Sequence, residues 1–109
     1  MDLYAAIQEK LDTLDKAIAL FGDRGKEEAE AERQYRMKKA EKILTLKAEG
    51  VPATLCHDIV NGDKEVADLR FKRDVARTMY KSIDHGINVS KLSVRILDEQ
   101  LKREYGNVK

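Results

Sequence analysis

The feature that most constrains this chain is the spacing of the apolar residues near the start of the sequence. Between residues 4 and 21 they recur at alternating intervals of three and four. That spacing puts them on one side of an α-helix, as in the a and d positions of packed helix pairs. The row consists of Tyr4, Ile7, Leu11, Leu14, Ile18 and Phe21. The chain is therefore predicted to begin with a helix that packs against another helix.

Composition extends the helical prediction to all 109 residues. Charged residues make up 38% of the chain, which contains only six Gly and one Pro, whereas a typical globular domain is about one quarter charged. A sheet-rich protein needs many turn residues, and a disordered chain would lack regularly spaced apolar residues. We predict one all-α domain over residues 1–109, an elongated helical hairpin or three-helix bundle with coiled-coil-like packing.

Glycine and proline divide the chain into four predicted helices. Residues 22–25 contain two glycines and are typical of a polar turn that reverses the chain. Gly50 ends the second helix, and Pro52 suits the first turn of a short third helix. Asp63 is a candidate N-cap for a long last helix, in which a kink or break is expected at 86–90 as the alternative to continuity. The predicted ranges are 2–21, 26–49, 52–60 and 63–105.

The second predicted helix presents apolar side chains in two directions. One side of its helical wheel carries Met37, Ala40 and Leu44. The other side carries Tyr35, Ile43 and Leu46. We therefore expect this helix to make contacts on two faces.

The last predicted helix has more apolar surface than one hairpin partner can cover. Its main apolar face is expected to meet the first two helices. That face consists of Leu69, Val75, Ala76, Met79, Ile83, Ile87, Val94, Leu97, Leu101 and Tyr105. A separate group, here called the apolar cluster, consists of Phe71, Val89, Leu92 and Ile96. Two interpretations stay open: the cluster is a self-association surface, or the short helix at 52–60 folds back over part of it.

Charge is distributed unevenly, although the net charge is only +1. Residues 1–32 carry four basic and nine acidic side chains, so their net charge is 4 − 9 = −5 and the remainder carries +6. Either an acidic segment folds against a basic one, or a basic surface is kept for an acidic partner.

Opposite the main apolar face of the last helix lies a row of basic residues, here called the basic stripe. It consists of Arg70, Arg73, Arg77, Lys81, Lys91, Arg95 and Lys102. Such a row could follow a phosphate backbone, because lysine and arginine contacts release condensed counterions. Four acidic residues lie in or beside the stripe, as on a solvated helix face. Nucleic-acid binding is therefore the alternative function, and a protein partner is preferred.

The sequence lacks the residue patterns of common catalytic and metal sites. It contains no paired-cysteine zinc motif, zinc-protease motif, glycine-rich phosphate loop or EF-hand loop. Cys56 and His57 are adjacent, and consecutive helix side chains diverge by about 100°, so they cannot form a nucleophile–base pair. We predict no catalytic residue, no metal site and no cofactor.

A cytoplasmic location is expected from three further absences. A single cysteine excludes an internal disulfide, and the first residues lack the basic and apolar regions of a signal peptide. No apolar run approaches the roughly 20 residues of a membrane span. We therefore expect a soluble protein that does not enter membranes.

Three stretches near the end of the chain carry a family resemblance. Residues 66–76, 87–92 and 95–104 resemble small all-helical proteins of unknown function from phages and prophages of Gram-positive bacteria. The resemblance implies a viral accessory protein in the bacterial host. It would act in phage DNA replication and recombination, or as an inhibitor of a bacterial defence system.

The predicted function is protein binding by a homo-oligomeric, non-enzymatic helical protein. As an inhibitor it could dock an acidic protein on the basic stripe. It could instead dock a basic nuclease on the acidic residues Asp12, Asp15, Glu28 and Glu32.

Overall fold

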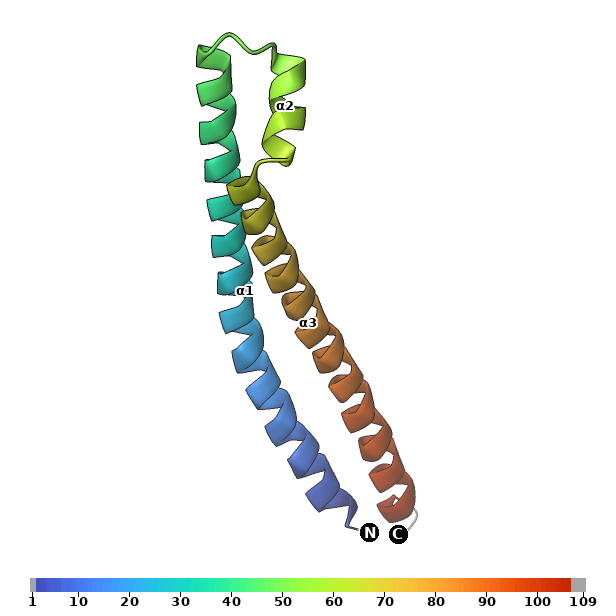
Figure 1. Cartoon of the computed structure of the whole chain (residues 1–109). Coiled ribbons are helices and arrows are strands. Elements are labelled where there is room, and N and C mark those ends of the chain that lie inside the picture. The colour runs from blue at the N-terminus through green and yellow to red at the C-terminus, as the bar shows by residue number, and fades with distance from the viewer. Residues whose placement is uncertain (1, 107–109) are drawn as a thin grey trace. The chain divides into compact units, whose positions relative to one another are not determined.

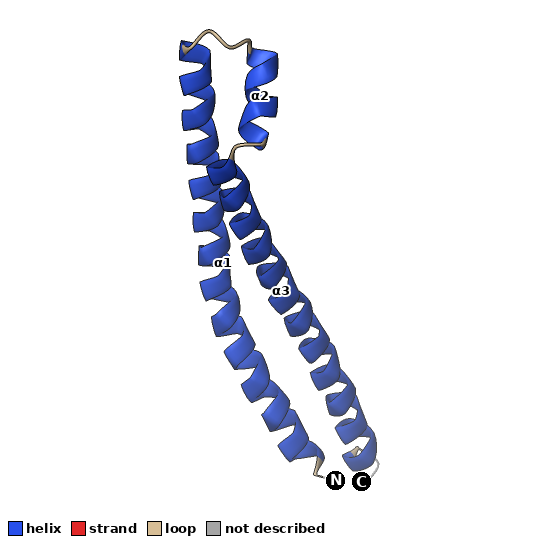
Figure 2. Cartoon of the chain, in the orientation of Figure 1, coloured by secondary structure: helices blue, strands red, loops and turns tan. Residues whose placement is uncertain are grey.

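The computed structural model describes residues 2–106, which form three α-helices. Helix α1 spans Leu3–Ala48, α2 spans Ala53–Asn61 and α3 spans Lys64–Tyr105 (Figure 1). No strand occurs in this part of the chain (Figure 2). The predicted all-α fold class is confirmed.

The chain divides into two compact units. Unit 1 combines residues 1–23 with 80–109, and unit 2 consists of residues 24–79. Helices α1 and α3 each contribute to both units, whereas α2 belongs to unit 2. The single domain expected over 1–109 stays a prediction.

The predicted turn at 22–25 is wrong, because α1 continues through both glycines. Gly22 and Gly25 have the helical backbone that any residue can adopt. Among the described glycines, a positive φ occurs at Gly50 alone. A helical glycine costs about 1 kcal/mol relative to alanine. Contacts on either side offset this cost. Phe21 stacks on Tyr80 in unit 1 with ring centres 4.5 Å apart, and Arg24 pairs with Glu27 at 2.9 Å in unit 2.

The alternative of a break at 86–90 is also wrong, since α3 is continuous from residue 64 to 105. Ile87 lies within this stretch and its residue is only 6% exposed. Burial of this side chain favours the helical backbone despite the neighbouring glycine.

The chain reverses instead at Gly50. Its φ is +88°, and its N–H donates to the Lys47 carbonyl at 3.0 Å. The Val51 N–H donates to the Leu46 carbonyl at 3.0 Å, which completes a Schellman motif. Pro52 then precedes α2 with extended ψ of 142°. The predicted helix end at Gly50 is confirmed.

Asp63 caps α3 as predicted. Its Oδ2 accepts a hydrogen bond from the Val66 N–H at 3.2 Å, and its carbonyl accepts one from the Ala67 N–H at 2.8 Å. These bonds satisfy backbone donors that the first helical turn leaves without partners.

The core of unit 2 lies where α2 packs on the helix pair. Tyr35, Val60 and Val66 form a buried cluster. Half-buried side chains surround the cluster, namely Ile43, Leu46 and Leu69. Helix α2 also buries Cys56 completely, and its thiol donates to the Val51 carbonyl at 3.5 Å. Of the two contact faces predicted for residues 26–49, the one with Tyr35, Ile43 and Leu46 joins this core, whereas the one with Met37, Ala40 and Leu44 is exposed.

The main apolar face of α3 is only partly covered, contrary to expectation. Ala76, Ile83 and Ile87 are buried or half-buried. Three other predicted members are exposed: Val75 at 42%, Met79 at 40% and Tyr105 at 69%. The physical reason is geometric, because two packed helices cover only a narrow strip of each other.

Candidate interaction surfaces

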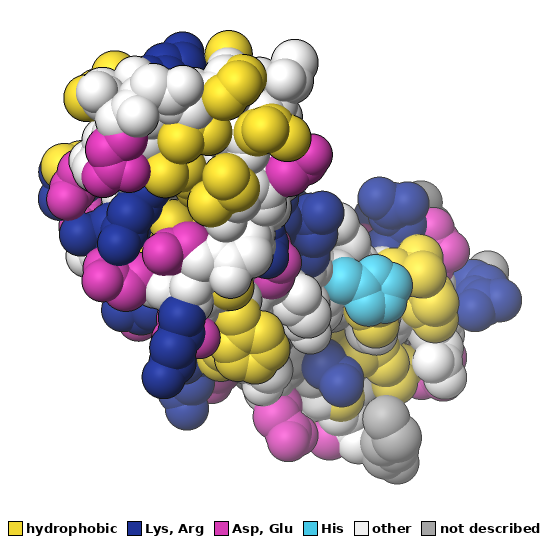
Figure 3. All heavy atoms as spheres, turned by 45° about the horizontal axis from the view of Figure 1, so that its top comes forward, with side chains coloured by type: hydrophobic (Ala, Val, Ile, Leu, Met, Phe, Trp, Pro, Cys, Tyr) yellow, Lys and Arg dark blue, Asp and Glu magenta, His cyan; other side chains and the backbone are white. Residues whose placement is uncertain are grey.

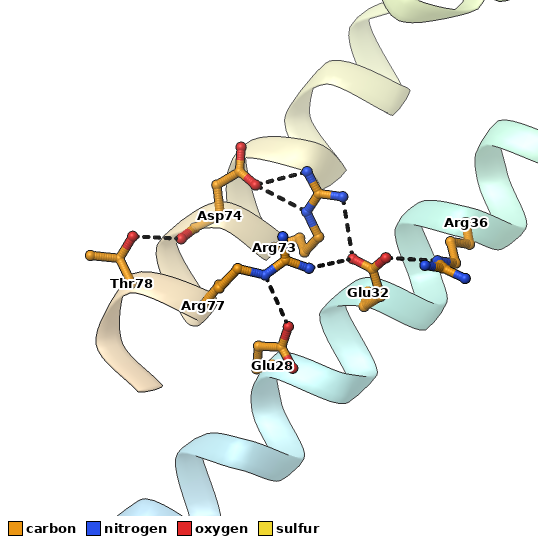
Figure 4. Close-up of polar contacts among 7 residues, drawn as sticks. All are labelled: Glu28, Glu32, Arg36, Arg73, Asp74, Arg77 and Thr78. Carbon is orange, nitrogen blue, oxygen red and sulfur yellow. Dashed lines mark hydrogen bonds and ion pairs between the residues drawn. The ribbon is translucent and has the colours of Figure 1, made fainter. Parts of the chain in front are cut away.

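A cluster of charged side chains joins α1 to α3 in unit 2 (Figure 4). Arg77 lies 3.3 Å from Glu28 and 3.3 Å from Glu32. Arg73 donates to the same Glu32 carboxylate at 3.3 Å. Here the acidic segment of the sequence folds against the basic one, so the first of the two charge interpretations holds for these four residues.

Arg73 is enclosed on several sides. Its side chain is only 16% exposed, and its guanidinium lies 4.5 Å from the centre of the Tyr35 ring. It also pairs with Asp74 at 2.8 Å. Guanidinium groups are attracted to aromatic faces, so Tyr35 and Glu32 together hold this charge inside the helix pair.

Glu32 is shared by two arginines of α3, Arg73 and Arg77, and by the exposed Arg36 of its own helix. Arg36 donates to it at 2.7 Å from the same helix. This hydrogen bond, with a contribution from Arg73, holds the pKa of Glu32 below its ordinary value. The carboxylate therefore stays ionised in the folded protein at neutral pH.

The basic stripe is not one free row of charge. In unit 2, Arg73 and Arg77 are committed to the charged cluster, and Arg70 donates to the Asn61 carbonyl at 3.1 Å. In unit 1, Lys102 pairs with Asp98 at 3.1 Å. The exposed remainder consists of Lys81, Lys91 and Arg95, which form no ion pair with any residue in 2–106.

The predicted apolar cluster is exposed throughout. Phe71, in unit 2, is 70% exposed. In unit 1, Val89 is 50% exposed, while Leu92 and Ile96 are each 52% exposed. All four residues are exposed, so the interpretation in which the short helix folds back over part of the cluster is wrong. Helix α2 buries its apolar side against the Tyr35 cluster instead.

A groove between α1 and α3 in unit 2 was not anticipated from the sequence. It consists of two adjacent depressions of about 580 Å³ and 470 Å³, which share Gln34. Their floor includes the exposed side chains of Met37, Val75 and Met79. Phe71 lines a smaller depression of about 250 Å³ together with Val75 and Met79. The groove is therefore continuous with one member of the apolar cluster.

A further apolar area lies at the end of unit 2 that carries α2. Leu55 is 51% exposed and Ile59 is 49% exposed. Figure 3 shows hydrophobic side chains gathered on this end of the molecule, with charged side chains around them. Helix α2 thus buries one side and leaves the other to solvent.

The described residues offer no metal site. No group of three or more His, Cys, Asp or Glu side chains in residues 2–106 could hold a metal ion. His57 and His85 are both exposed, while Cys56 is buried. Among residues 2–106, no helix has the length and apolar character needed to cross a membrane.

Comparisons with known proteins supply no relative. No family model matches the chain, and neither the search of curated proteins nor that of solved structures finds a match. Function must therefore be inferred from the residues of this chain.

Proposed function

We propose that this protein is a non-enzymatic helical interaction protein that associates with itself and binds another protein through apolar helix surfaces. One observation carries the proposal. Within residues 2–106, seven hydrophobic residues are buried, whereas fourteen large ones are exposed. Several of these are neighbours on one helix face, such as Val89, Leu92 and Ile96, and contiguous exposed apolar side chains favour contact with another chain.

The apolar cluster on α3 supports self-association in unit 1. Val89, Leu92 and Ile96 recur at intervals of three and four, as in a helix that packs against a second helix. Each is about half exposed. A partner helix would remove this apolar surface from water, which is the main favourable contribution to association.

A charge placed inside the cluster provides the test. Leu92→Lys should lower the average mass measured by size-exclusion chromatography with light scattering, because a lysine in an apolar contact is costly to desolvate. Gln8→Lys is the matched control, since it adds the same charge at an exposed position of unit 1 on α1. If Leu92→Lys and the wild type have the same mass at every concentration, the cluster is not the contact.

The resemblance to phage proteins suggests where this protein would act and what kind of partner it would bind. A phage accessory protein in the host cytoplasm would bind a host or phage protein, either in DNA metabolism or to inhibit a defence system. The absence of catalytic motifs in the sequence supports a binding role over catalysis.

Nucleic-acid binding is the second candidate, and one observation favours it. Lys81, Lys91 and Arg95 are exposed and free of ion pairs with residues 2–106. If they contact phosphates, changing all three to Gln should weaken DNA binding and reduce its salt dependence by about one unit of slope per lost contact. A salt titration with single-stranded and double-stranded DNA measures this. No affinity at low salt would eliminate the candidate.

A further inference from the structure

We infer that the groove between α1 and α3 in unit 2 binds the same groove of a second copy of this chain, with the two copies antiparallel. The inference rests on the proposed function, because it adds a second contact for self-association to the apolar cluster of unit 1. The observations that carry it are the apolar floor of the groove and the polarity of the charges along it.

The floor of the groove is apolar and accessible. Met37 is 59% exposed, Val75 is 42% exposed and Met79 is 40% exposed. Leu69 and Ala31 lie deeper and line the same two depressions. A groove of this kind between two helices accepts the apolar side of further helices, and flexible methionine side chains adapt to the surface that they meet.

Some charged residues along the groove already form ion pairs within the chain, and only the others can pair with a second copy. Glu27 pairs with Arg24 at 2.9 Å, and Glu30 pairs with Arg33 at 2.8 Å. These pairs neutralise the acidic residues at the end of the groove near Met79.

The end of the groove near Met79 is left basic. Lys26 and Lys72 line this depression and form no ion pair with residues 2–106. Both residues are exposed. Lys72 contributes to the lowered pKa of Glu30 only from beyond ion-pair distance, so neither ammonium group is held by an ion pair and both can meet a partner.

The other end of the groove is left acidic. Lys38 is shared by Glu41 and Glu65 at 3.5 Å each. Asp68 lines the same depression and forms no ion pair with residues 2–106. Glu65 also pairs with Lys42 at 3.6 Å, so each glutamate has a lysine partner and Asp68 carries the unmatched negative charge at this end.

The two oppositely charged ends let the groove bind a copy of itself about a twofold axis that runs perpendicular to the helices. In a twofold dimer every contact occurs twice, so a pair formed by residue i of one copy and residue j of the other also forms between j and i. Inverting the second copy brings its acidic end opposite the basic end of the first. The α3 helices then cross near Phe71, so that Lys72 of each copy faces Asp68 of the other.

A parallel arrangement of the two grooves is disfavoured. Ion pairs within unit 2 place residues 28 and 32 of α1 level with residues 77 and 73 of α3. By the same register, Lys72 lies level with Arg33. Parallel packing would place α3 of one copy on α1 of the other, so that Lys72 meets Arg33, whose charge is already matched by Glu30, and gains no unpaired acidic partner.

The size of the groove predicts a weak and reversible dimer. It follows residues 26–41 of α1, a length of about 22 Å at 1.5 Å per residue. Two helices side by side are about 20 Å wide, so each copy contributes about 450 Å² of contact. This is roughly half of the 800 Å² per partner found in stable complexes.

Charge exchange at Asp68 and Lys72 tests the inference. Lys72→Glu alone places acid opposite acid in the dimer, and Asp68→Lys alone places base opposite base. We expect each single variant to dimerise about three- to tenfold more weakly than wild type, as exposed charge pairs typically allow. The double variant D68K/K72E should recover wild-type dimerisation, because both pairs are restored with opposite polarity.

Mixing the two single variants gives the sharper result. Every contact in a mixed dimer joins an acid to a base, so native mass spectrometry should find mixed dimers well above the half expected from random pairing. The same exchange at Lys81 and Asp84 is the matched control, since both residues are exposed on α3 outside the groove. That control should give random pairing.

The outcomes separate this inference from the proposed function. Random pairing of the Asp68 and Lys72 variants, with dimerisation equal to wild type, would overturn the antiparallel groove contact and leave self-association intact. A wild-type protein that stays monomeric at millimolar concentration would overturn both.

Discussion

Arg73 of α3 lies over the ring of Tyr35 of α1, with its guanidinium carbon 4.5 Å from the ring centre. This contact puts a charged side chain that is only 16% exposed against a buried aromatic residue. It joins the charged cluster to the apolar core of unit 2. A residue that the sequence assigns to a solvent-facing basic stripe therefore belongs to the contact between the helices.

Replacing Arg73 tests this assignment. We expect Arg73→Ala to lower the free energy of unfolding by about 1–2 kcal/mol, through loss of the aromatic contact and of the Glu32 pair. Arg36→Ala is the matched control, because Arg36 pairs with the same carboxylate but is 77% exposed. Its cost should stay below about 0.5 kcal/mol. Urea unfolding at one protein concentration measures both. Equal costs would show that the enclosed position of Arg73 has no energetic consequence.

The carboxylates of α1 predict how stability depends on pH. A hydrogen bond from Arg33, supported by one from Gln34, lowers the pKa of Glu30 from 4.5 to about 2. A carboxyl group with a lowered folded pKa stabilises the protein above its unfolded pKa, and this stabilisation is lost as pH falls through the folded pKa. The contribution of Glu30 should therefore be complete at neutral pH and decline between pH 4.5 and about 2.

A double-mutant cycle measures this contribution. Glu30→Gln should reduce stability at neutral pH, and the difference from wild type should disappear near pH 2. In an Arg33→Gln background, the same substitution should have little effect at either pH, because the main cause of the lowered pKa is gone. A Glu30→Gln effect that is independent of pH would contradict the assignment.

The continuity of α1 predicts opposite effects at two glycines. Gly22 has a helical backbone and no atom within 4 Å of the position of an added Cβ. Gly22→Ala should raise the free energy of unfolding by about 0.5–1 kcal/mol. Gly50→Ala should lower it by about 1 kcal/mol, because a φ of +88° strains any residue with a Cβ. Destabilisation by Gly22→Ala, seen in thermal unfolding, would favour a turn at 22–25 instead.

The cap of α3 provides a stability test near α2. Asp63→Ala should cost about 1 kcal/mol, since the Val66 N–H loses its acceptor. Asp63→Asn keeps an oxygen acceptor but removes the negative charge, which lies 3.6 Å from Lys42. Its cost should be smaller than that of the alanine variant in chemical denaturation. If the two variants are equally unstable, the ion pair and not the cap is the stabilising contact.

The sequence predicted those helix ends at which one residue type restricts or caps the backbone. Gly50, Pro52 and Asp63 each require or favour one conformation, so the C-terminal end of α1 and the starts of α2 and α3 could be located. The glycines at 22 and 25 permit both a turn and a helix. Packing between helices decides between them, and a single sequence does not contain that information.

The candidate surfaces were predicted less completely for a related reason. The wheel separates Phe71 and Leu92 from the main apolar face correctly, since their exposure follows from helix periodicity alone. Helix periodicity cannot show that Ala76 is half-buried in the folded chain while Met79 stays exposed to solvent. The positions of Arg73 and of the groove depend on the register between α1 and α3, which periodicity within one helix does not fix.

Sedimentation equilibrium of the wild-type protein, from micromolar to millimolar concentration, tests the central claim most directly. Self-association through exposed apolar helix surfaces predicts an average mass that rises above 12.4 kDa as concentration increases. The rise should be reversible on dilution, because the groove alone offers a small contact. A mass of 12.4 kDa across the whole range would contradict the account.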